Sequence, residues 1–289
     1  MTTMTTIKTM TILTTMTTIT RMTTITPISI GRAGSVQFNG YIDEVRITKG
    51  IARYSGNFLT PVVAYPDSGS VYDGNYGNVA LLLHMDGGNN STVFTDSSPT
   101  PKTITVYGNA KISTTQSKFS GSSLYFDGSG DYLSIATSQD FDLGNVYTIE
   151  FFVYNLNATP AGGILHKGYY SSITHLWSGF AFSIRGIGTA TRFYFYASTN
   201  VDERYIDVPA SLPQNAWQHV AMVRNGSSGA VYIDGVPSGT ITGLNSTVPS
   251  SETLRVGLWD FNTASEYFNG HLAEVRVTKG VARYTDRKS

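Results

Sequence analysis

The sequence predicts an all-β protein built as an antiparallel two-sheet sandwich. Only 14% of the 289 residues are charged, while Gly (29), Tyr (18) and Phe (14) are plentiful. Aromatic residues favour strands, glycines favour turns, and few charges argue against solvent-exposed helices. Short runs of alternating apolar and polar residues recur between turn signals, and we find no convincing helical periodicity with caps. Many short strands of this kind are typical of a two-sheet sandwich.

The first segment, Met1–Thr26, is of low complexity, with Thr alternating with Met and Ile. Thr and Ile suit strands, so the segment is compatible with a spacer strand or a sheet shared between chains. It has no apolar core of its own, however, and we therefore assign it no structure.

A repeat sets the domain organisation. Phe38–Tyr54 aligns without gaps on Phe268–Tyr284, and twelve of the seventeen positions are identical. The first copy belongs to residues 27–61, which we interpret as the C-terminal remnant of a first module. About 35 residues are too few to bury a core alone, so this remnant is expected either to dock as an added edge strand or to stay mobile. Residues 62–78 are predicted to be a linker, residues 79–284 a complete module and residues 285–289 a tail.

The complete module contains the predicted strands in regular succession. In Trp217–Arg224, alternate positions face opposite sides of a sheet. The Asp234–Gly235 pair predicts a tight hairpin turn, because Gly tolerates the positive φ that such a turn needs. The predicted strands are Ala80–Met85, Thr103–Tyr107, Ser123–Phe126, Tyr132–Ile135, Thr148–Tyr154, Gly179–Ile184, Arg192–Tyr196, Trp217–Val223, Ala230–Asp234, Thr253–Gly257 and Gly270–Val277.

Composition excludes several classes of function. The net charge is zero and no basic cluster is present, which argues against nucleic-acid binding. The chain has no Cys, so it can form no disulfide, thiolate nucleophile or Cys-zinc site. The longest apolar stretch, around Val79–Leu83, is too short for membrane insertion as a helix. The N-terminus lacks the apolar core of a signal peptide.

A series of short motifs resembles a known family. The motifs are Leu81–Asp86, Phe94–Ser98, Gly121–Gly128, Asp131–Leu133, Thr148–Val153, Trp217–Val220, Val231–Gly235 and Gly270–Val277. In this order they resemble a laminin-G-like module of the concanavalin A-like lectin/glucanase superfamily, over roughly Val79–Tyr284. The resemblance implies a jelly-roll sandwich that commonly binds carbohydrate or serves adhesion. The closing run Thr278–Tyr284 is similar to modules of phage structural and tail proteins and of bacterial surface proteins, which implies a virion or extracellular location.

The acidic residues predict no catalysis. The superfamily's glucanases carry Glu-x-Asp-x-Glu on one strand, and a retaining glycosidase needs two carboxyl groups about 5–5.5 Å apart. The nearest pair here, Asp43 and Glu44, is adjacent and therefore points to opposite faces of a strand. In the complete module the pair becomes Ala273 and Glu274, which leaves one acid. A Gly-x-Ser-x-Gly elbow is also missing. The chain is thus predicted not to be an enzyme.

The resemblance implies a structural calcium ion, with Asp127, Asp131 and Glu274 as candidate ligands. Calcium needs about six to eight oxygen ligands, so loop carbonyls would have to contribute. The Asp that usually precedes this Glu in the family is Ala273 here, which weakens the prediction. The favoured alternative is that Glu274 and Arg276, two apart on one strand face, form an ion pair that ties neighbouring strands.

Aromatic residues predict a carbohydrate site in the segment Lys167–Gly179, interpreted as a loop between strands. It contains Tyr169, Tyr170, His175 and Trp177, and Trp259 is placed in another inter-strand loop that would contribute from the same end. Sugar C–H faces stack on aromatic rings, and loops on a rigid sandwich often carry such sites. The alternative, that these rings cap the sandwich ends, is equally open. Trp217, His84 and His219 are instead expected to be packing or satisfied strand residues.

The predicted function is weak, multivalent binding to glycans or cell-surface polysaccharide, since arrays of weak sites gain avidity. The alternative is a structural spacer or decoration domain that contacts other virion or surface proteins and binds no sugar.

Overall fold

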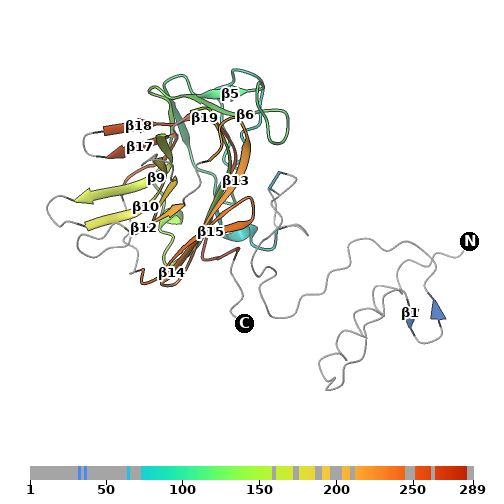
Figure 1. Ribbon diagram of the computed structural model, residues 1–289. Coiled ribbons are helices and arrows are strands. Elements are labelled where there is room, and N and C mark those ends of the chain that lie inside the picture. The colour runs from blue at the N-terminus through green and yellow to red at the C-terminus, as the bar shows by residue number, and fades with distance from the viewer. Residues whose placement is uncertain are drawn as a thin grey trace, which may run out of the picture. The chain divides into compact units, whose positions relative to one another are not determined.

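The computed structural model of the protein describes residues 32–33, 36–37, 64–65, 73–157, 161–171, 176–185, 191–195, 204–208, 212–244, 251–261 and 264–284 (Figure 1). The chain divides into two compact units, Met1–Ile51 and Ala52–Ser289. In the first, β1 (Arg32–Ala33) pairs antiparallel with β2 (Val36–Gln37). The low-complexity segment Met1–Thr26 and the repeat copy Phe38–Tyr54 lie outside the described residues, so neither prediction for them is tested.

The second unit is a sandwich of two antiparallel sheets, as predicted. The seven-stranded sheet has the order β12 (Arg204–Val208), β11 (Thr191–Phe195), β10 (Leu176–Arg185), β9 (Ala161–Ser171), β16 (Leu254–Val256), β7 (Tyr132–Ile135) and β4 (Ile104–Tyr107). The eight-stranded sheet has the order β15 (Val236–Ile241), β14 (Ser228–Ile233), β13 (Trp217–Asn225), β8 (Val146–Asn155), β19 (Asn269–Lys279), β6 (Ser123–Asp127) and β5 (Lys111–Ser113), and β3 (Val79–Leu83) also pairs with β19.

A separate hairpin and two short 3-10 helices complete the unit. The hairpin consists of β17 (Leu258–Phe261) and β18 (Ala264–Tyr267), and the helices are η2 (Tyr76–Asn78) and η3 (Gln139–Phe141). No helix among the described residues is long and apolar enough to cross a membrane.

Each of the eleven predicted strands overlaps an observed one, and the predicted Asp234–Gly235 turn joins β14 to β15 with φ of 49° and 77°. The loop predicted over Lys167–Gly179 is wrong for most of its length. Strand β9 continues to Ser171 and β10 begins at Leu176, so the segment is a long hairpin. Its Gly and Ser content is typical of a loop, but the two strands pair in register from Lys167 and Phe180 to Ser171 and Leu176.

Strand β8 is buried on both faces. Ile149, Phe151 and Val153 point into the main core between the sheets. Phe152, on the opposite face, belongs to a second apolar cluster with Tyr65, Val79, Leu82 and Ala273. Because both faces are covered, seven of the ten residues of this strand are apolar or aromatic, as is typical of strands buried on both sides, and Glu150 is a buried exception.

A β-bulge interrupts the alternation of side chains between the two faces of strand β19. Ala273 pairs with Phe152 and Arg276 with Glu150, so two residues of β19 lie opposite one residue of β8. Glu274, at the bulge, has a left-handed φ of 51°. The extra residue returns Val275 to the main core and places Arg276 on the same outer face as Ala273. Glu274 and Arg276 both contact Tyr65, so the structure does not contradict the prediction that they share a strand face.

The hairpin β17–β18 packs closely against β9 (Figure 1). A Cβ atom on Gly163 would lie 2.1 Å from the backbone nitrogen of Trp259, and one on Gly162 would lie 2.6 Å from the carbonyl oxygen of Tyr267. Backbone atoms cannot give way as side chains do, so these two positions require glycine.

Gly163→Ala should lower the free energy of unfolding by about 2–3 kcal/mol, because the new methyl group overlaps the backbone of β17. The measurement is urea unfolding followed by tryptophan fluorescence. Gly77→Ala is the matched control, since a Cβ there meets nothing within 4 Å. Equal stability of the two variants would contradict the close packing.

Candidate functional site

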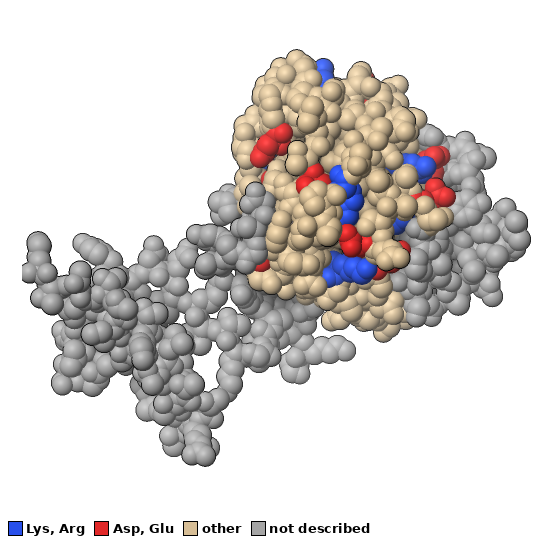
Figure 2. All heavy atoms as spheres, turned by 180° about the vertical axis from the view of Figure 1, so that it is seen from behind, with Lys and Arg blue, Asp and Glu red and all other residues tan. Residues whose placement is uncertain are grey.

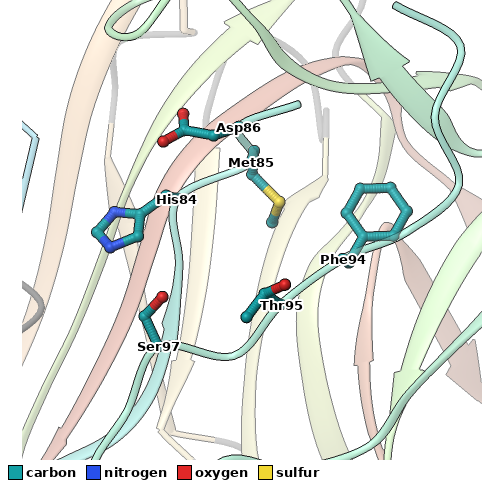
Figure 3. A pocket seen from close by; sticks show the side chains of 6 residues that line it. All are labelled: His84, Met85, Asp86, Phe94, Thr95 and Ser97. Atoms are coloured by element: carbon teal, nitrogen blue, oxygen red, sulfur yellow. The ribbon is translucent and has the colours of Figure 1, made fainter. Parts of the chain in front are cut away.

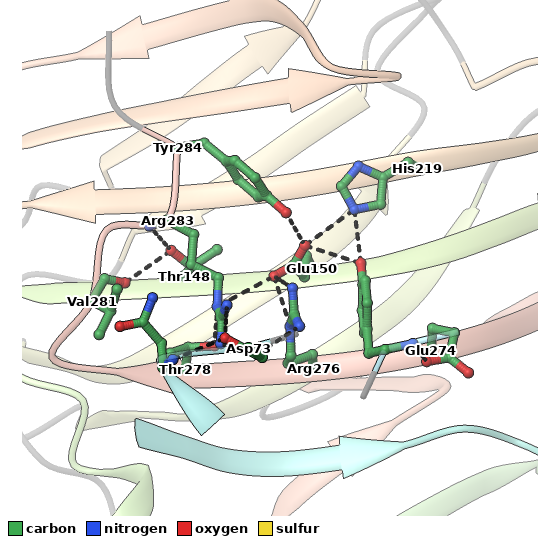
Figure 4. Close-up of polar contacts among 12 residues, drawn as sticks. Asp73, Thr148, Glu150, His219, Glu274, Arg276, Thr278, Val281, Arg283 and Tyr284 are labelled. Atoms are coloured by element: carbon green, nitrogen blue, oxygen red, sulfur yellow. Dashed lines mark hydrogen bonds and ion pairs between the residues drawn. The ribbon is translucent and has the colours of Figure 1, made fainter. Parts of the chain in front are cut away.

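A buried carboxylate, Glu150 on β8, lies at the centre of a polar network on the outer face of the eight-stranded sheet (Figure 4). Its side chain is 0% exposed. Oε1 accepts hydrogen bonds from Nε and Nη2 of Arg276 at 2.9 and 2.7 Å. Oε2 accepts hydrogen bonds from the hydroxyls of Tyr65 and Tyr284 at 3.0 and 2.7 Å, and lies 3.3 Å from Nε2 of His219.

A second acid, Asp73, balances the charge of the arginines. It accepts a hydrogen bond from Nη1 of Arg276 at 3.2 Å and from Nη1 and Nη2 of Arg283 at 3.0 and 2.9 Å. The guanidinium of Arg276 also lies 3.6 Å from the ring centroid of Tyr65. Two carboxylates thus meet two guanidinium groups, and Tyr65 and Asp73 bring the predicted linker region 62–78 into the sandwich.

The network keeps its groups charged. Burial alone would raise the pKa of Glu150, but Arg276, His219 and Arg283 lower it well below its usual range. Burial would likewise lower the pKa of Arg276, yet Glu150 raises it above its ordinary value. Burial and Glu150 raise the pKa of Tyr284, which therefore remains a hydrogen-bond donor. A buried pair of this kind is stable only when its remaining polar atoms are satisfied, as they largely are here.

The network gives the repeated sequence a structural role. Arg276, Arg283 and Tyr284 all contact Glu150 or Asp73. The same residue types recur at positions 46, 53 and 54 of the first copy. An ion pair of Arg276 with Glu274 was predicted, but the acids that bind Arg276 are Glu150 of β8 and Asp73.

The three candidate calcium ligands are not brought together. Asp131 is buried, and its two oxygens accept backbone N–H groups of Asn109 at 2.6 Å and Asp127 at 3.1 Å. Glu274 lies elsewhere, where it accepts the N–H of Tyr65 at 2.7 Å and contacts Nδ1 of His84 at 2.9 Å. Within the described residues no group of three His, Asp or Glu side chains is placed to hold a metal ion. These N–H donors stabilise a turn and do not fit the oxygen-rich surroundings that calcium requires.

The candidate carbohydrate residues are also distributed differently from the prediction. Tyr170 and Trp177 are direct cross-strand partners of β9 and β10, and Tyr169 is the partner of Ser178. His175 lies outside the described residues. Trp259 is on β17 instead of in a loop; it is 2% exposed and its ring lies 6.1 Å from that of His166. A buried ring cannot stack on a sugar, so Trp259 is a packing residue in this structure.

An exposed aromatic pair was missed by the sequence interpretation. Tyr107 at the end of β4 is 44% exposed and is the cross-strand partner of Tyr132 at the start of β7. The two rings are stacked, with centroids 4.4 Å apart and planes 3° from parallel. Strand alternation would have revealed the pair, because Val106 and Leu133 pack on the core and their neighbours must face outward.

Charged groups accompany this pair. Nη1 of Arg255 lies 3.7 Å from Oδ2 of Asp260. Burial and Tyr107 raise the pKa of Tyr132, whereas Arg255 opposes this effect, so these groups interact electrostatically. We call Tyr107, Tyr132, Arg255 and Asp260 the tyrosine platform. On the face shown in Figure 2, Lys and Arg side chains lie among Asp and Glu in small groups, so that face shows no large patch of one sign.

Comparison with known proteins gives one family and several structural relatives. Residues 127–283 match the family described as the concanavalin A-like lectin/glucanases superfamily. Domain 4 of AbnA, an extracellular arabinanase of Geobacillus stearothermophilus solved with arabinotriose, has a TM-score of 0.50 and 18% identity, covering 71% of this chain and 94% of that domain. No curated protein sequence matches the chain.

Two toxin binding domains are similar as well. The binding domain of botulinum neurotoxin DC in complex with SialylT has a TM-score of 0.53 and 16% identity, covering 73% of this chain and 49% of that one. The binding domain of Paraclostridial mosquitocidal protein 1 has a TM-score of 0.53 and 13% identity, covering 71% and 49%. The chain spans about half the length of these toxin domains, and the likeness shows a shared fold.

Glu150→Gln should lower the free energy of unfolding by about 3–5 kcal/mol, because Arg276 loses its charged partner in a buried site. Since the pKa of Glu150 is lowered by folding, its contribution is present above its unfolded pKa of about 4.3 and is lost as the pH falls below that value. Denaturant unfolding at pH 7 and pH 3 measures both effects. Asp140→Asn, which breaks the more exposed ion pair with Lys102, is the control and should cost about 1 kcal/mol or less. A comparable loss in both variants would contradict the central role of Glu150.

His166→Phe should stabilise the fold and flatten its acid response. His166 on β9 is 1% exposed and neither ring nitrogen has a hydrogen-bond partner; burial, helped by Arg255, lowers its pKa to about 3. Below about pH 6.5 the unfolded chain binds a proton that the folded chain does not, so this residue destabilises the fold as the pH falls from about 6.5 toward 3. Replacing orphaned nitrogens by an apolar ring should add about 1 kcal/mol at neutral pH. Melting temperatures between pH 7 and pH 5 test this, and a lower melting temperature for the variant at every pH would contradict it.

Proposed function

Because the chain belongs to the concanavalin A-like lectin/glucanase superfamily, we propose that it is a non-catalytic carbohydrate-binding module. The observation that carries the proposal is the tyrosine platform on the seven-stranded sheet. Sugars offer apolar C–H faces to aromatic rings and hydroxyl groups to polar side chains. The exposed face of Tyr107 supplies the first kind of contact, and the Arg255–Asp260 pair supplies donors and acceptors for the second.

The acids of the central strands support a binding role without hydrolysis. Glu150 is fully buried and saturated by Arg276 and two tyrosine hydroxyls. Glu274 is equally buried and is held by His84 and the N–H of Tyr65. A general acid or nucleophile must reach the glycosidic bond, which neither carboxylate does in this structure.

Structural relatives point to the same class of ligand. The domain of AbnA was solved with arabinotriose, and the neurotoxin domain with SialylT. These ligands belong to those proteins; for this chain they support carbohydrate as the ligand class. We retain Tyr170 and Trp177 of the β9–β10 hairpin as a second proposed aromatic contact, because they are partners in the register of the two strands.

The proposed setting is a virion, a phage tail or a bacterial cell surface, where the partners would be surface glycans and other virion or surface proteins. Support comes from the closing run Thr278–Tyr284 and its earlier copy Thr48–Tyr54, which resemble such modules in tandem. Several weak sites in one assembly would give useful avidity without strong individual binding. The alternative is a spacer or decoration domain that binds no glycan, and the following experiment distinguishes it from a carbohydrate-binding module.

Tyr107→Ala and Tyr132→Ala should each weaken glycan binding by about tenfold, because stacking of a sugar on the ring is lost. Binding is measured on a glycan array and, for each ligand found, by calorimetry. Tyr205→Ala is the matched control, since Tyr205 is 38% exposed but lies on β12, at the other edge of the sheet.

Tyr170→Ala and Trp177→Ala on the same array test the hairpin separately. Binding that depends on this pair and not on Tyr107 would move the site to the hairpin. Absence of binding by the wild-type chain to every glycan would favour the spacer domain.

A further inference from the structure

A pocket beside the end of β3 shares no residue with the tyrosine platform. It has a volume of about 170 Å³ and is lined by His84, Met85, Asp86, Phe94, Thr95 and Ser97 (Figure 3). Polar groups of His84, Asp86, Thr95 and Ser97 and the apolar groups of Met85 and Phe94 therefore surround one small space.

The backbone at this pocket is held in an unfavourable conformation. Met85 has a φ of 66°, and Glu274, which contacts the pocket residue His84, has a φ of 51°. The other described non-glycine residues with positive φ are Asn90, Ser120, Asn215 and Asp234, all short polar residues. A left-handed Met or Glu costs free energy and persists only where its surroundings impose it, and such residues cluster at functional sites.

Specific contacts impose the conformation at Met85. The hydroxyl of Ser122 donates a hydrogen bond to the carbonyl oxygen of Met85 at 3.2 Å and accepts one from the N–H of Gly87 at 3.2 Å. The Met85 side chain is buried in the main core. The turn is thereby fixed on both sides, and the neighbouring residues His84 and Asp86 are fixed with it.

The bulge at Glu274 orients His84. It directs the Glu274 carboxylate to Nδ1 of His84, at 2.9 and 3.0 Å from its two oxygens, while the N–H of Tyr65 holds the same carboxylate at 2.7 Å. A carboxylate on one ring nitrogen fixes the orientation of an imidazole, an arrangement found where histidines bind ligands.

The opposite wall of the pocket is equally rigid. Asp96 is buried and accepts the N–H groups of Leu82 at 3.0 Å, Ser98 at 3.0 Å and Lys102 at 2.8 Å. The N–H of Ser97 donates to the carbonyl oxygen of Leu82 at 2.8 Å. The pocket is therefore preorganised, and a ligand would not have to order its walls.

We propose that this pocket binds one neutral sugar unit, held by hydrogen bonds to Asp86, Ser97 and His84 and by apolar contact with Phe94. The carboxylates of Asp86 and Glu274 disfavour acidic sugars and phosphates through repulsion of like charges. The volume is below the roughly 300–1,000 Å³ of pockets for larger ligands, so it suits a single ring. The ligand class rests on the proposed function, whereas the site is formed by residues separate from the platform.

The test is an NMR titration of the full chain with glucose, galactose, mannose and N-acetylglucosamine, and with N-acetylneuraminic acid as the acidic sugar. We expect amide shifts confined to residues 84–97 with at least one neutral sugar and none with the acidic one. Methyl glycosides of the binding sugar mimic the terminal unit of a glycan. Titrating them beside the free sugar distinguishes recognition of such a unit from recognition of a free monosaccharide. Asp86→Asn and Ser97→Ala should each weaken the binding by about tenfold through loss of a hydrogen bond to the ligand.

Tyr107→Ala is the control, because it removes the platform and should leave these shifts unchanged. Asp86 is exposed, so its variant is expected to fold, and its melting temperature verifies this. The absence of shifts with every neutral sugar, an unchanged affinity in both pocket variants, or equal binding of the acidic sugar would overturn the proposal. Glycan-array binding that depends on Tyr107 would still support the tyrosine platform in that case, so the two proposals can fail independently.

Discussion

The Glu150 carboxylate is buried without access to solvent, and the structure around it follows from the need to keep it charged. Transferring an isolated carboxylate into a protein interior costs several kcal/mol, so partners must surround it. Arg276 on the neighbouring strand places a positive charge in direct contact with Glu150. Arg283 and Asp73 complete the network, which then holds two guanidinium groups and two carboxylates. These contacts define where the chain segments before β3 and after β19 run, because Tyr65, Asp73 and Tyr284 all belong to the network. The outer face of the eight-stranded sheet is therefore closed by ion pairs as well as by apolar packing.

The strands that alternate strictly could be predicted from the sequence. Tyr132–Ile135 was predicted with its observed bounds, and the Asp234–Gly235 turn was predicted with its positive φ values. The β9–β10 hairpin was not predicted, because the Gly and Ser residues of Lys167–Gly179 are typical of a loop, whereas the two strands pair in register up to Ser171 and Leu176. Gly162 and Gly163, at the start of β9, likewise give no local strand signal. They are required by the close approach of the β17–β18 backbone, about 95 residues away in sequence.

The sites were less predictable than the fold for the same reason. The bulge at Glu274 interrupts the alternation of β19, since Leu272, Ala273 and Val275 are all apolar, and this signal was available. Tyr107 and Tyr132 were also within reach of strand alternation. The partnership of Glu150 with Tyr65 and Tyr284 was not, because it joins residues 85 and 134 positions apart. Trp259 was predicted in a binding loop because it stands next to an acid. In the structure it belongs to β17, and its ring packs against His166.

One detail of the network bears on how the module responds to mechanical force. The hydroxyls of Tyr65 and Tyr284 donate to the same oxygen atom, Oε2 of Glu150. Tension applied to the chain before residue 65 and after residue 284 would therefore load this network before it loads the sheets. Separating the two segments would require both hydroxyl hydrogen bonds to break, together with the contacts of Arg283 with Asp73. Modules of this construction, joined in a row, would resist pulling first at this network, which lies on the sheet opposite to the one that carries Tyr107 and Tyr132.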